Sequence, residues 1–203
     1  MCKIKTNKVM SIKRFTPERV NNLSKNEVFV FGSNIQGEHV GGAAWQAFQK
    51  FGAELGKGFG YQGQSYAIPT CIRLQGEEGR YTKPFDNINQ IKPYVEVFIS
   101  ETNRFKDLLT FYVTKIGCGI AGFKVSEVVE LFRSCLEMDN VILPKEFVEW
   151  LLYTNVIAEL NKRGLIGGKD YDDDIVMRFV MERIGGKYSL DDILDEFENI
   201  KPY

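Results

Sequence analysis

The sequence predicts an α/β fold in which a mostly parallel, mixed β-sheet lies between two layers of helices. Residues 27–31 form a continuous apolar run, which is typical of a strand buried on both faces of a parallel sheet, and the run of residues 109–115 predicts another strong strand. Each run leads through a glycine-rich loop into a helical pattern, so strands and helices alternate from about residue 27 to residue 144. This alternation implies right-handed crossovers, which place helices on both faces of the sheet.

The remaining elements follow from local signals. Thr16, Pro17 and Glu18 predict the start of a short helix that ends near Leu23, because Thr caps a helix and Pro suits its first position. The polar segment 75–87 is expected to be a surface loop. Further helices are expected at residues 43–51, 88–103 (interrupted near Pro93) and 125–136, and further strands at residues 65–69 and 140–144.

The C-terminal part of the chain differs in composition from the rest. Acidic residues outnumber basic ones after Leu151, and helical patterns at 145–162, 172–184 and 189–199 are separated by glycines. We therefore expect an α/β domain over residues 1–147 and an acidic helical extension over residues 148–203.

Composition excludes several classes of protein. The net charge of −1 supplies no global basic field that would attract a nucleic-acid backbone. No stretch of about 18 apolar residues is present, so no membrane span is expected, and the predicted location is the cytoplasm. The single histidine and the absence of CxxC spacing argue against a metal site, and the wide, irregular spacing of the cysteines argues against a disulfide framework. No cofactor is expected. The four cysteines are expected to be free thiols: Cys2, Cys71, Cys118 and Cys135.

A glycine-rich loop follows the first predicted strand and leads directly into a helix. Its candidate ligand-binding residues are Gly32, Ser33, Asn34, Gly41, Gly42 and Ala43. Ligands of α/β sheets bind outside the carboxyl ends of the strands. Glycines let backbone amides approach a phosphate, and a helix N-terminus adds partial positive charge. The pattern therefore predicts a phosphate-binding loop.

Two polar residues of this loop are candidate catalytic residues. Asn34 offers a donor and an acceptor that suit ribose hydroxyls, although an Asn here can instead close a turn on its own backbone. His39 is a candidate base or hydrogen-bond donor, and its more ordinary role is a loop histidine that faces solvent.

A second strand–glycine–helix turn follows the strand predicted at residues 109–115. Its candidate ligand-binding residues are Gly117, Cys118, Gly119, Ile120, Ala121, Gly122 and Phe123. The three glycines leave amides free to surround a diphosphate. Phe123 either packs on a ribose or base, or fills the space between helix and sheet. Cys118 has no base partner in the sequence, which favours a packed residue over a nucleophile.

These motifs resemble a known family. Residues 30–34 (VFGSN) and 41–44 (GGAA) resemble the first loop of macro domains, and residues 116–123 (IGCGIAGF) look like their second, phosphate-gripping loop. Residues 66–70 (YAIPT) stand where related domains often carry a strand that ends in Pro-Thr-Lys. The similarity is closest to bacterial and phage-encoded macro-like proteins and extends to antitoxin macro domains that remove ADP-ribose from DNA. It covers about residues 15–147.

The resemblance implies a macro-domain-like fold and a role for each matching residue. Asn34 would contact the distal ribose, Gly41 and Gly42 would lie against the diphosphate, and Thr70 would belong to the same site. Residues 117–122 would wrap the phosphates from the other side, and Phe123 would cover the distal ribose. Cys71 departs from the pattern, because the DNA-acting relatives have a catalytic lysine there, and a neutral thiol cannot replace a lysine in that role without new partners.

The resemblance and the loops together predict a module that binds ADP-ribose or a related NAD-derived nucleotide, free or attached to a macromolecule. One alternative is an ADP-ribosyl glycohydrolase in which Asn34 or His39 assists an ordered water. Another is a protein-interaction module that acts through the acidic C-terminal helices.

Overall fold

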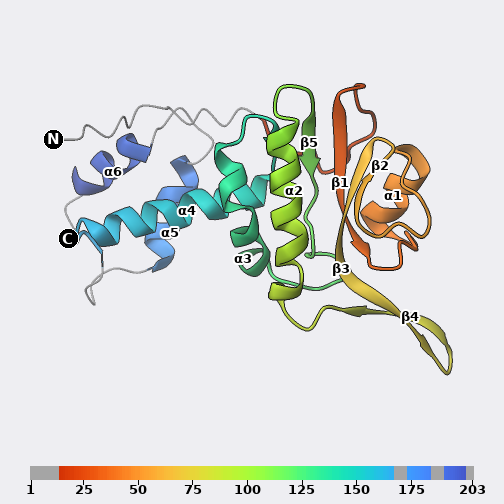
Figure 1. Ribbon diagram of the computed structural model, residues 1–203. Helices are drawn as coiled ribbons and strands as arrows, with labels where there is room; N and C mark the ends of the chain where they lie inside the picture. Colours follow the sequence, from red (N-terminus) through yellow and green to blue (C-terminus); the bar gives the residue numbers. More distant parts are fainter. Residues whose placement is uncertain (1–13, 167–172, 184–189, 200–203) are drawn as a thin grey trace. The chain divides into compact units, whose positions relative to one another are not determined.

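The computed structural model describes residues 14–166, 173–183 and 190–199 (Figure 1). Two compact units are present. One comprises residues 15–148, and the other includes the helices beyond Glu149. Each unit is described by itself below.

The first unit is built on a mixed, mostly parallel sheet, as the sequence predicts. β1 is parallel to both β3 and β5, β6 is parallel to β5, and β2 and β4 are antiparallel to β3. The strand order is β2-β3-β1-β5-β6, and β4 pairs with the outer half of β3. The strands are β1 (Glu27–Asn34), β2 (Gly60–Gln62), β3 (Ser65–Gly76), β4 (Gly79–Pro84), β5 (Thr110–Val113) and β6 (Val141–Ile142).

Helices connect these strands. Asn87 caps a short 3-10 turn, and Pro93 lies in the first turn of α2, where its missing N–H is not needed. This explains the interruption that the sequence predicts near Pro93. The helical elements of this unit are α1 (Gly42–Lys50), η1 (Ile88–Gln90), α2 (Lys92–Arg104), α3 (Val125–Val128), the 3-10 helix η2 (Val129–Glu137) and the start of α4 (Lys145–Lys162).

The two faces of the sheet bury different side chains, because successive residues of a strand point to opposite faces. Phe29 and Phe31 of β1 pack with Ala44, Ala47 and Phe51 under α1. The opposite face, toward α2, is aromatic. Its rings lie 5.1 to 6.4 Å apart between centroids and belong to Tyr66, Phe98, Phe111, Phe132 and Phe147. The sheet thus has helices on both faces (Figure 1).

The prediction of a helix at residues 16–23 is wrong. Thr16 instead forms an isolated parallel bridge with Pro144. Its amide donates to the carbonyl of Leu143 at 2.9 Å, and its hydroxyl donates to the carbonyl of Ile142 at 2.7 Å. Pairing with the segment after β6 satisfies the groups that would otherwise have capped a helix.

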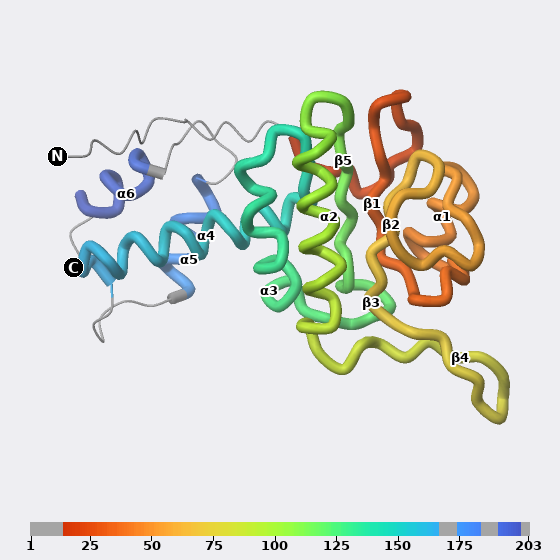
Figure 2. The backbone as a smooth tube through the Cα atoms, in the orientation of Figure 1, coloured from red at the N-terminus to blue at the C-terminus, as the bar shows by residue number. Residues whose placement is uncertain are grey.

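Residues 75–87 lie mostly at the surface, as expected, but most of the segment is β-strand and not loop. β3 continues to Gly76, turns through Glu77 and Glu78, and returns as β4. Figure 2 shows this hairpin extending away from the rest of the unit. Most of β4 is exposed, so the hairpin lacks the alternation of apolar and polar residues that identifies a half-buried strand.

The second unit is helical and confirms the predicted C-terminal helices. α5 (Asp173–Arg183) and α6 (Leu190–Asn199) follow α4, while residues 172, 184 and 189 lie outside the described residues. Arg183 lies 3.6 Å from the centroid of the Phe179 ring and forms an ion pair with Glu196. The core of this unit consists of Val156, Leu160, Val176, Val180, Ile193, Leu194 and Phe197.

Membrane-spanning helices and metal-binding clusters are both absent from the described residues. No helix there combines the length and apolarity that crossing a membrane requires. No cluster of three or more His, Cys, Asp or Glu in the same ranges could hold a metal ion. Cys71, Cys118 and Cys135 are free, and Cys2 lies outside the described residues.

Candidate functional site

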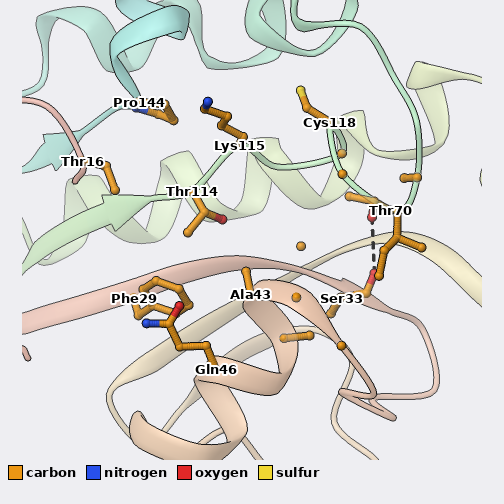
Figure 3. A pocket seen from close by; sticks show the side chains of 18 of the residues that line it. Thr16, Phe29, Ser33, Ala43, Gln46, Thr70, Thr114, Lys115, Cys118 and Pro144 are labelled. Atoms are coloured by element: carbon orange, nitrogen blue, oxygen red, sulfur yellow. Dashed lines mark hydrogen bonds between the residues drawn. The ribbon is translucent and has the colours of Figure 1, made fainter. Parts of the chain in front are cut away.

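A pocket of about 910 Å³ lies where the parallel strands β1, β3 and β5 converge (Figure 3). Chain segments that are distant in sequence form its wall. They are residues 15–18, 32–34, 40–44, 70–71, 114–115, 117–121 and 144–146, together with Val20, Phe29, Gln46 and Thr82. In Figure 3, Thr16 and Gln46 lie at one end of the pocket, and Ser33 and Thr70 lie at the other.

Thr70 of β3 and the loop that follows β5 both approach β1 at Gly32. A Cβ at Gly32 would lie 3.7 Å from the amide nitrogen of Gly117 and 3.7 Å from the hydroxyl of Thr70. Thr114 donates its hydroxyl to the carbonyl of Val30 at 2.9 Å, which ties the start of the second loop to β1. The two predicted loops and the end of the β3 pairing therefore share one site.

Asn34 both shapes the first loop and lines the pocket. Its side-chain Oδ1 accepts from the amide of Glu38 at 3.1 Å, and its carbonyl accepts from the amide of Gly37 at 3.0 Å. Asn34 thus closes a turn on its own backbone. Its Nδ2 donates to no acceptor in the described part of the chain, so this amide group can donate to a ligand.

The first loop leads into the N-terminus of α1, which also lines the pocket. Gly41 is the N-cap of α1, and no side chain forms a capping hydrogen bond there. The first turn of the helix contains no acidic residue. Within the described ranges, the amides of Gly42, Ala43 and Ala44 have no acceptor. Unpaired amides at a helix N-terminus carry partial positive charge and favour an anion.

The second loop presents a further set of amides to the same pocket. Its internal hydrogen bonds run from Cys118 to Lys115, from Gly122 to Gly119 and from Phe123 to Gly117. The amides that find no acceptor among the described residues are those of Gly117, Gly119, Ile120 and Ala121. All four of these residues line the pocket.

Gly117 is required for this shape. Its φ is +74°, in the left-handed region that favours glycine, and a Cβ there would lie 3.3 Å from Cγ2 of Val128. A side chain at this position would therefore be strained and would press on α3.

Two apolar side chains stand at the mouth of the pocket. Val40 of the first loop is 58% exposed and Ile120 of the second loop is 64% exposed. The loops approach each other here, because a Cβ at Gly41 would lie 3.8 Å from Cδ1 of Ile120. A ligand held between the loops would cover both side chains.

The two cysteines that line the pocket are neutral thiols near pH 7. Burial raises the pKa of Cys118 to about 11. Burial also raises the pKa of Cys71, whose Sγ lies 3.5 Å from the carbonyl oxygen of Ser33. Because the thiolate is the nucleophilic form, neither residue is poised for nucleophilic catalysis.

His39 is buried, which corrects the expectation that it faces solvent. Its ring is 0% exposed and packs edge-on against Phe31, with 5.3 Å between ring centroids. Nε2 donates to the carbonyl of Glu54 at 3.0 Å, while Nδ1 has no partner in the described structure. The loop folds over the α1 face of the sheet and takes His39 into the core. His39 is not among the residues that line the pocket.

The structure places the other predicted site residues in two groups. Gly122 and Phe123 lie just beyond the pocket lining, and the Phe123 ring would contact a Cβ at Gly117 at 3.5 Å. Those that line the pocket are Gly32, Ser33, Asn34, Gly41, Gly42, Ala43, Thr70, Gly117, Cys118, Gly119, Ile120 and Ala121.

Sequence reasoning missed one end of the pocket, which residues 15–18, Gln46, Lys115 and residues 144–146 form. Lys115 forms an ion pair with Glu146. Lys115 is the last residue of the strand predicted at residues 109–115, next to the second glycine-rich loop, which was a usable signal. Residues 15–18 gave no such signal, because their sequence is typical of a helix start, whereas Thr16 forms a parallel bridge with Pro144.

Comparisons with known proteins add no relative: no protein-family model, no curated protein and no solved structure matches this chain.

Proposed function

We propose that residues 15–148 bind ADP-ribose or a related NAD-derived nucleotide, as a module that reads or sequesters it. One observation carries the proposal. Two sets of unpaired backbone amides, at the start of α1 and in residues 117–121, line one pocket of about 910 Å³. That volume lies in the upper part of the range for small-molecule sites, roughly 300–1,000 Å³.

The arrangement suits a diphosphate with a sugar on each side. Backbone amides and a helix N-terminus bind phosphates without arginine or lysine, which agrees with a chain of net charge −1. Nδ2 of Asn34 is a donor for ribose hydroxyls at one end. The other end, where Phe29 and Gln46 line the pocket, would take the base. The resemblance of both loops to macro domains supports the same assignment.

Binding is favoured over hydrolysis by the state of the candidate catalytic groups. Oδ1 of Asn34 is occupied by the amide of Glu38, and His39 is buried outside the pocket lining. Cys71, at the position of the catalytic lysine in DNA-acting macro domains, is a neutral thiol. The hydrolase alternative would require turnover of an ADP-ribosylated substrate that is lost in Asn34→Ala or His39→Gln while ADP-ribose binding is kept.

Calorimetric titration of ADP-ribose into the purified protein tests the proposal, with Gly119→Glu and Gly119→Gln as a matched pair. A Cβ at Gly119 meets no atom within 4 Å, so both variants should fold, as circular dichroism can verify. We expect micromolar binding by the wild type, no binding by Gly119→Glu, and a smaller loss for the neutral Gln. No heat from the wild type at millimolar ADP-ribose would contradict the proposal.

A further inference from the structure

The charged side chains of the pocket are gathered at one end, which residues 15–18 and 144–146 form. Among the described residues, the charged ones that line the pocket are Glu18, Lys115, Lys145 and Glu146. Two are acidic and two are basic, so their formal charges cancel. This end therefore offers no net positive charge to an anion, in contrast to the two loops, whose unpaired amides line the rest of the wall.

A carboxylate already occupies the cation of Lys115. Its ε-ammonium donates to Oε1 of Glu146, in an ion pair that joins the segment after β5 to the first turn of α4. Burial opposes the ionisation of Glu146, but hydrogen bonds from Lys115 and from its own backbone amide outweigh burial and lower its pKa. Glu146 is therefore ionised near pH 7, in a helix turn where negative charge is favourable.

Glu18 places a second acid near the same lysine. The hydrogen bond to Glu146 raises the pKa of Lys115, and the charges of Glu146 and Glu18 add to this effect. The segment that carries Glu18 is held in place, because Thr16 bonds through its amide and its hydroxyl to the backbone after β6. Two fixed carboxylates thus compete with any further anion for Lys115.

The ion pair of Lys115 and Glu146 lies where the adenosine ribose of the proposed ligand would be. The base would lie beside Phe29 and Gln46 and the diphosphate against the second loop, so this ribose would lie between them. In the view of Figure 3, Lys115 lies between Pro144, at the base end, and Cys118 of the second loop. A carboxylate has about four acceptor sites, so Glu146 can accept from ribose hydroxyls while it holds Lys115.

We propose that Glu146, held by Lys115, makes the pocket selective for nucleotides whose adenosine ribose carries free hydroxyls, and against those that carry a 2′-phosphate. The favoured class derives from NAD and the excluded class from NADP. The inference rests on the proposed function, which supplies the orientation of the nucleotide. Free hydroxyls would donate to Glu146, whereas a 2′-phosphate would bring further negative charge against a carboxylate. In dinucleotide-binding folds an Asp or Glu likewise accepts from the ribose 2′-hydroxyl of NAD.

Calorimetry with two ligands tests the selectivity: ADP-ribose, and ADP-ribose with a phosphate on the 2′ oxygen of its adenosine ribose. We expect the wild type to bind unphosphorylated ADP-ribose about tenfold more tightly, because like charges repel in a partly buried site. Glu146→Gln should weaken ADP-ribose about threefold, because a neutral amide is a poorer acceptor than a carboxylate. It should strengthen the phosphorylated ligand about tenfold, because Lys115 can then pair with the phosphate. The two affinities therefore move in opposite directions.

Two control variants isolate the charge of Glu146. Glu146→Asp keeps the carboxylate and should keep the preference for unphosphorylated ADP-ribose. Glu130→Gln breaks an ion pair with Arg133 outside the pocket lining and should change neither affinity. The side chains of Glu130 and Glu146 are equally exposed, at 45% and 44%, so the two Gln variants are matched. Circular dichroism verifies that each variant is folded.

The outcomes separate this inference from the proposed function. If the wild type binds ADP-ribose but binds the phosphorylated ligand equally or more tightly, the selectivity is wrong and the proposed function stands. A tenfold preference that survives in Glu146→Gln also overturns the inference, because its source then lies elsewhere in the pocket. If the wild type binds neither ligand, both proposals fail.

Discussion

Gly58 passes directly against the backbone of Asn34. A Cβ at Gly58 would overlap the carbonyl oxygens of both Asn34 and Ile35, at separations that real Cβ atoms essentially never show. The hydroxyl of Ser33 donates to the carbonyl of Gly58, which holds the two segments together. A residue far from the predicted loops thus supports the loop that carries Asn34.

Gly58→Ala should destabilise the protein, because the obstructing atoms are backbone and cannot move aside as a side chain would. We expect a loss of about 1–3 kcal/mol in the free energy of unfolding, as for other cases of overpacking. Urea denaturation followed by circular dichroism measures it. The control is Gly119→Ala, whose Cβ meets no atom within 4 Å and which should stay within about 0.5 kcal/mol of wild type. Equal stability of the two variants would show that the close approach is absent.

Cys118 should react slowly with iodoacetamide at neutral pH, because burial raises its pKa to about 11 and the thiolate is the reactive form. The rate should rise about tenfold per pH unit above neutrality as the thiolate fraction grows. Mass spectrometry of the folded protein measures the modification, and ADP-ribose should slow it. Cys135 is the internal control, since it is 1% exposed and burial raises its pKa to about 12. Labelling of Cys118 at pH 7 as fast as that of free cysteine would contradict the raised pKa of this half-buried thiol.

The raised pKa of Cys118 also makes the stability of the protein depend on pH in the alkaline range. The folded thiol of Cys118 stays neutral up to about pH 11, whereas the thiol of the unfolded chain ionises above its ordinary pKa of 9.0. Between about pH 9 and pH 11 the unfolded chain therefore releases a proton that the folded protein keeps. This release stabilises the unfolded state, so the free energy of unfolding falls as the pH rises. Cys118→Ser should reduce this fall, and an unchanged slope would contradict the assignment.

His39→Ala should lower the stability of the protein strongly and change its affinity for ADP-ribose only slightly. It removes the edge contact with Phe31 and the hydrogen bond to Glu54, and leaves a cavity beside the core. We expect a loss of about 2–4 kcal/mol in the free energy of unfolding, in the range of large-to-small core substitutions. Below the unfolding temperature, ADP-ribose affinity should change less than threefold. A large loss of affinity with unchanged stability would instead place His39 in the site.

Much of the fold could be predicted from local sequence. The apolar run of residues 27–31 indicated a strand buried on both faces, and β1 indeed has parallel neighbours on each side. The C-terminal helices were predictable because glycines separate three helical patterns. The pocket residues of the two glycine loops were predictable for a related reason, since parallel strands bring their carboxyl ends, and the loops that follow them, to one edge of a sheet.

The remaining features depended on partners that local sequence does not reveal. Thr16 carries a helix-start signal, yet it pairs with Pro144, more than a hundred residues away. The hairpin of β3 and β4 carries no apolar alternation, because most of β4 faces solvent. Its Arg73 contacts Glu38, which lies tens of residues earlier in the chain.

By itself, the sequence determined where buried strands, helices and glycine loops lie, because hydrophobic periodicity and backbone freedom are properties of neighbouring residues. Tertiary structure alone decided that His39 enters the core, that residues 15–18 and 144–146 complete the pocket, and that Arg73 and Arg80 meet Glu38. Each of these depends on contacts between residues far apart in the chain, where packing and hydrogen bonding outweigh local preference.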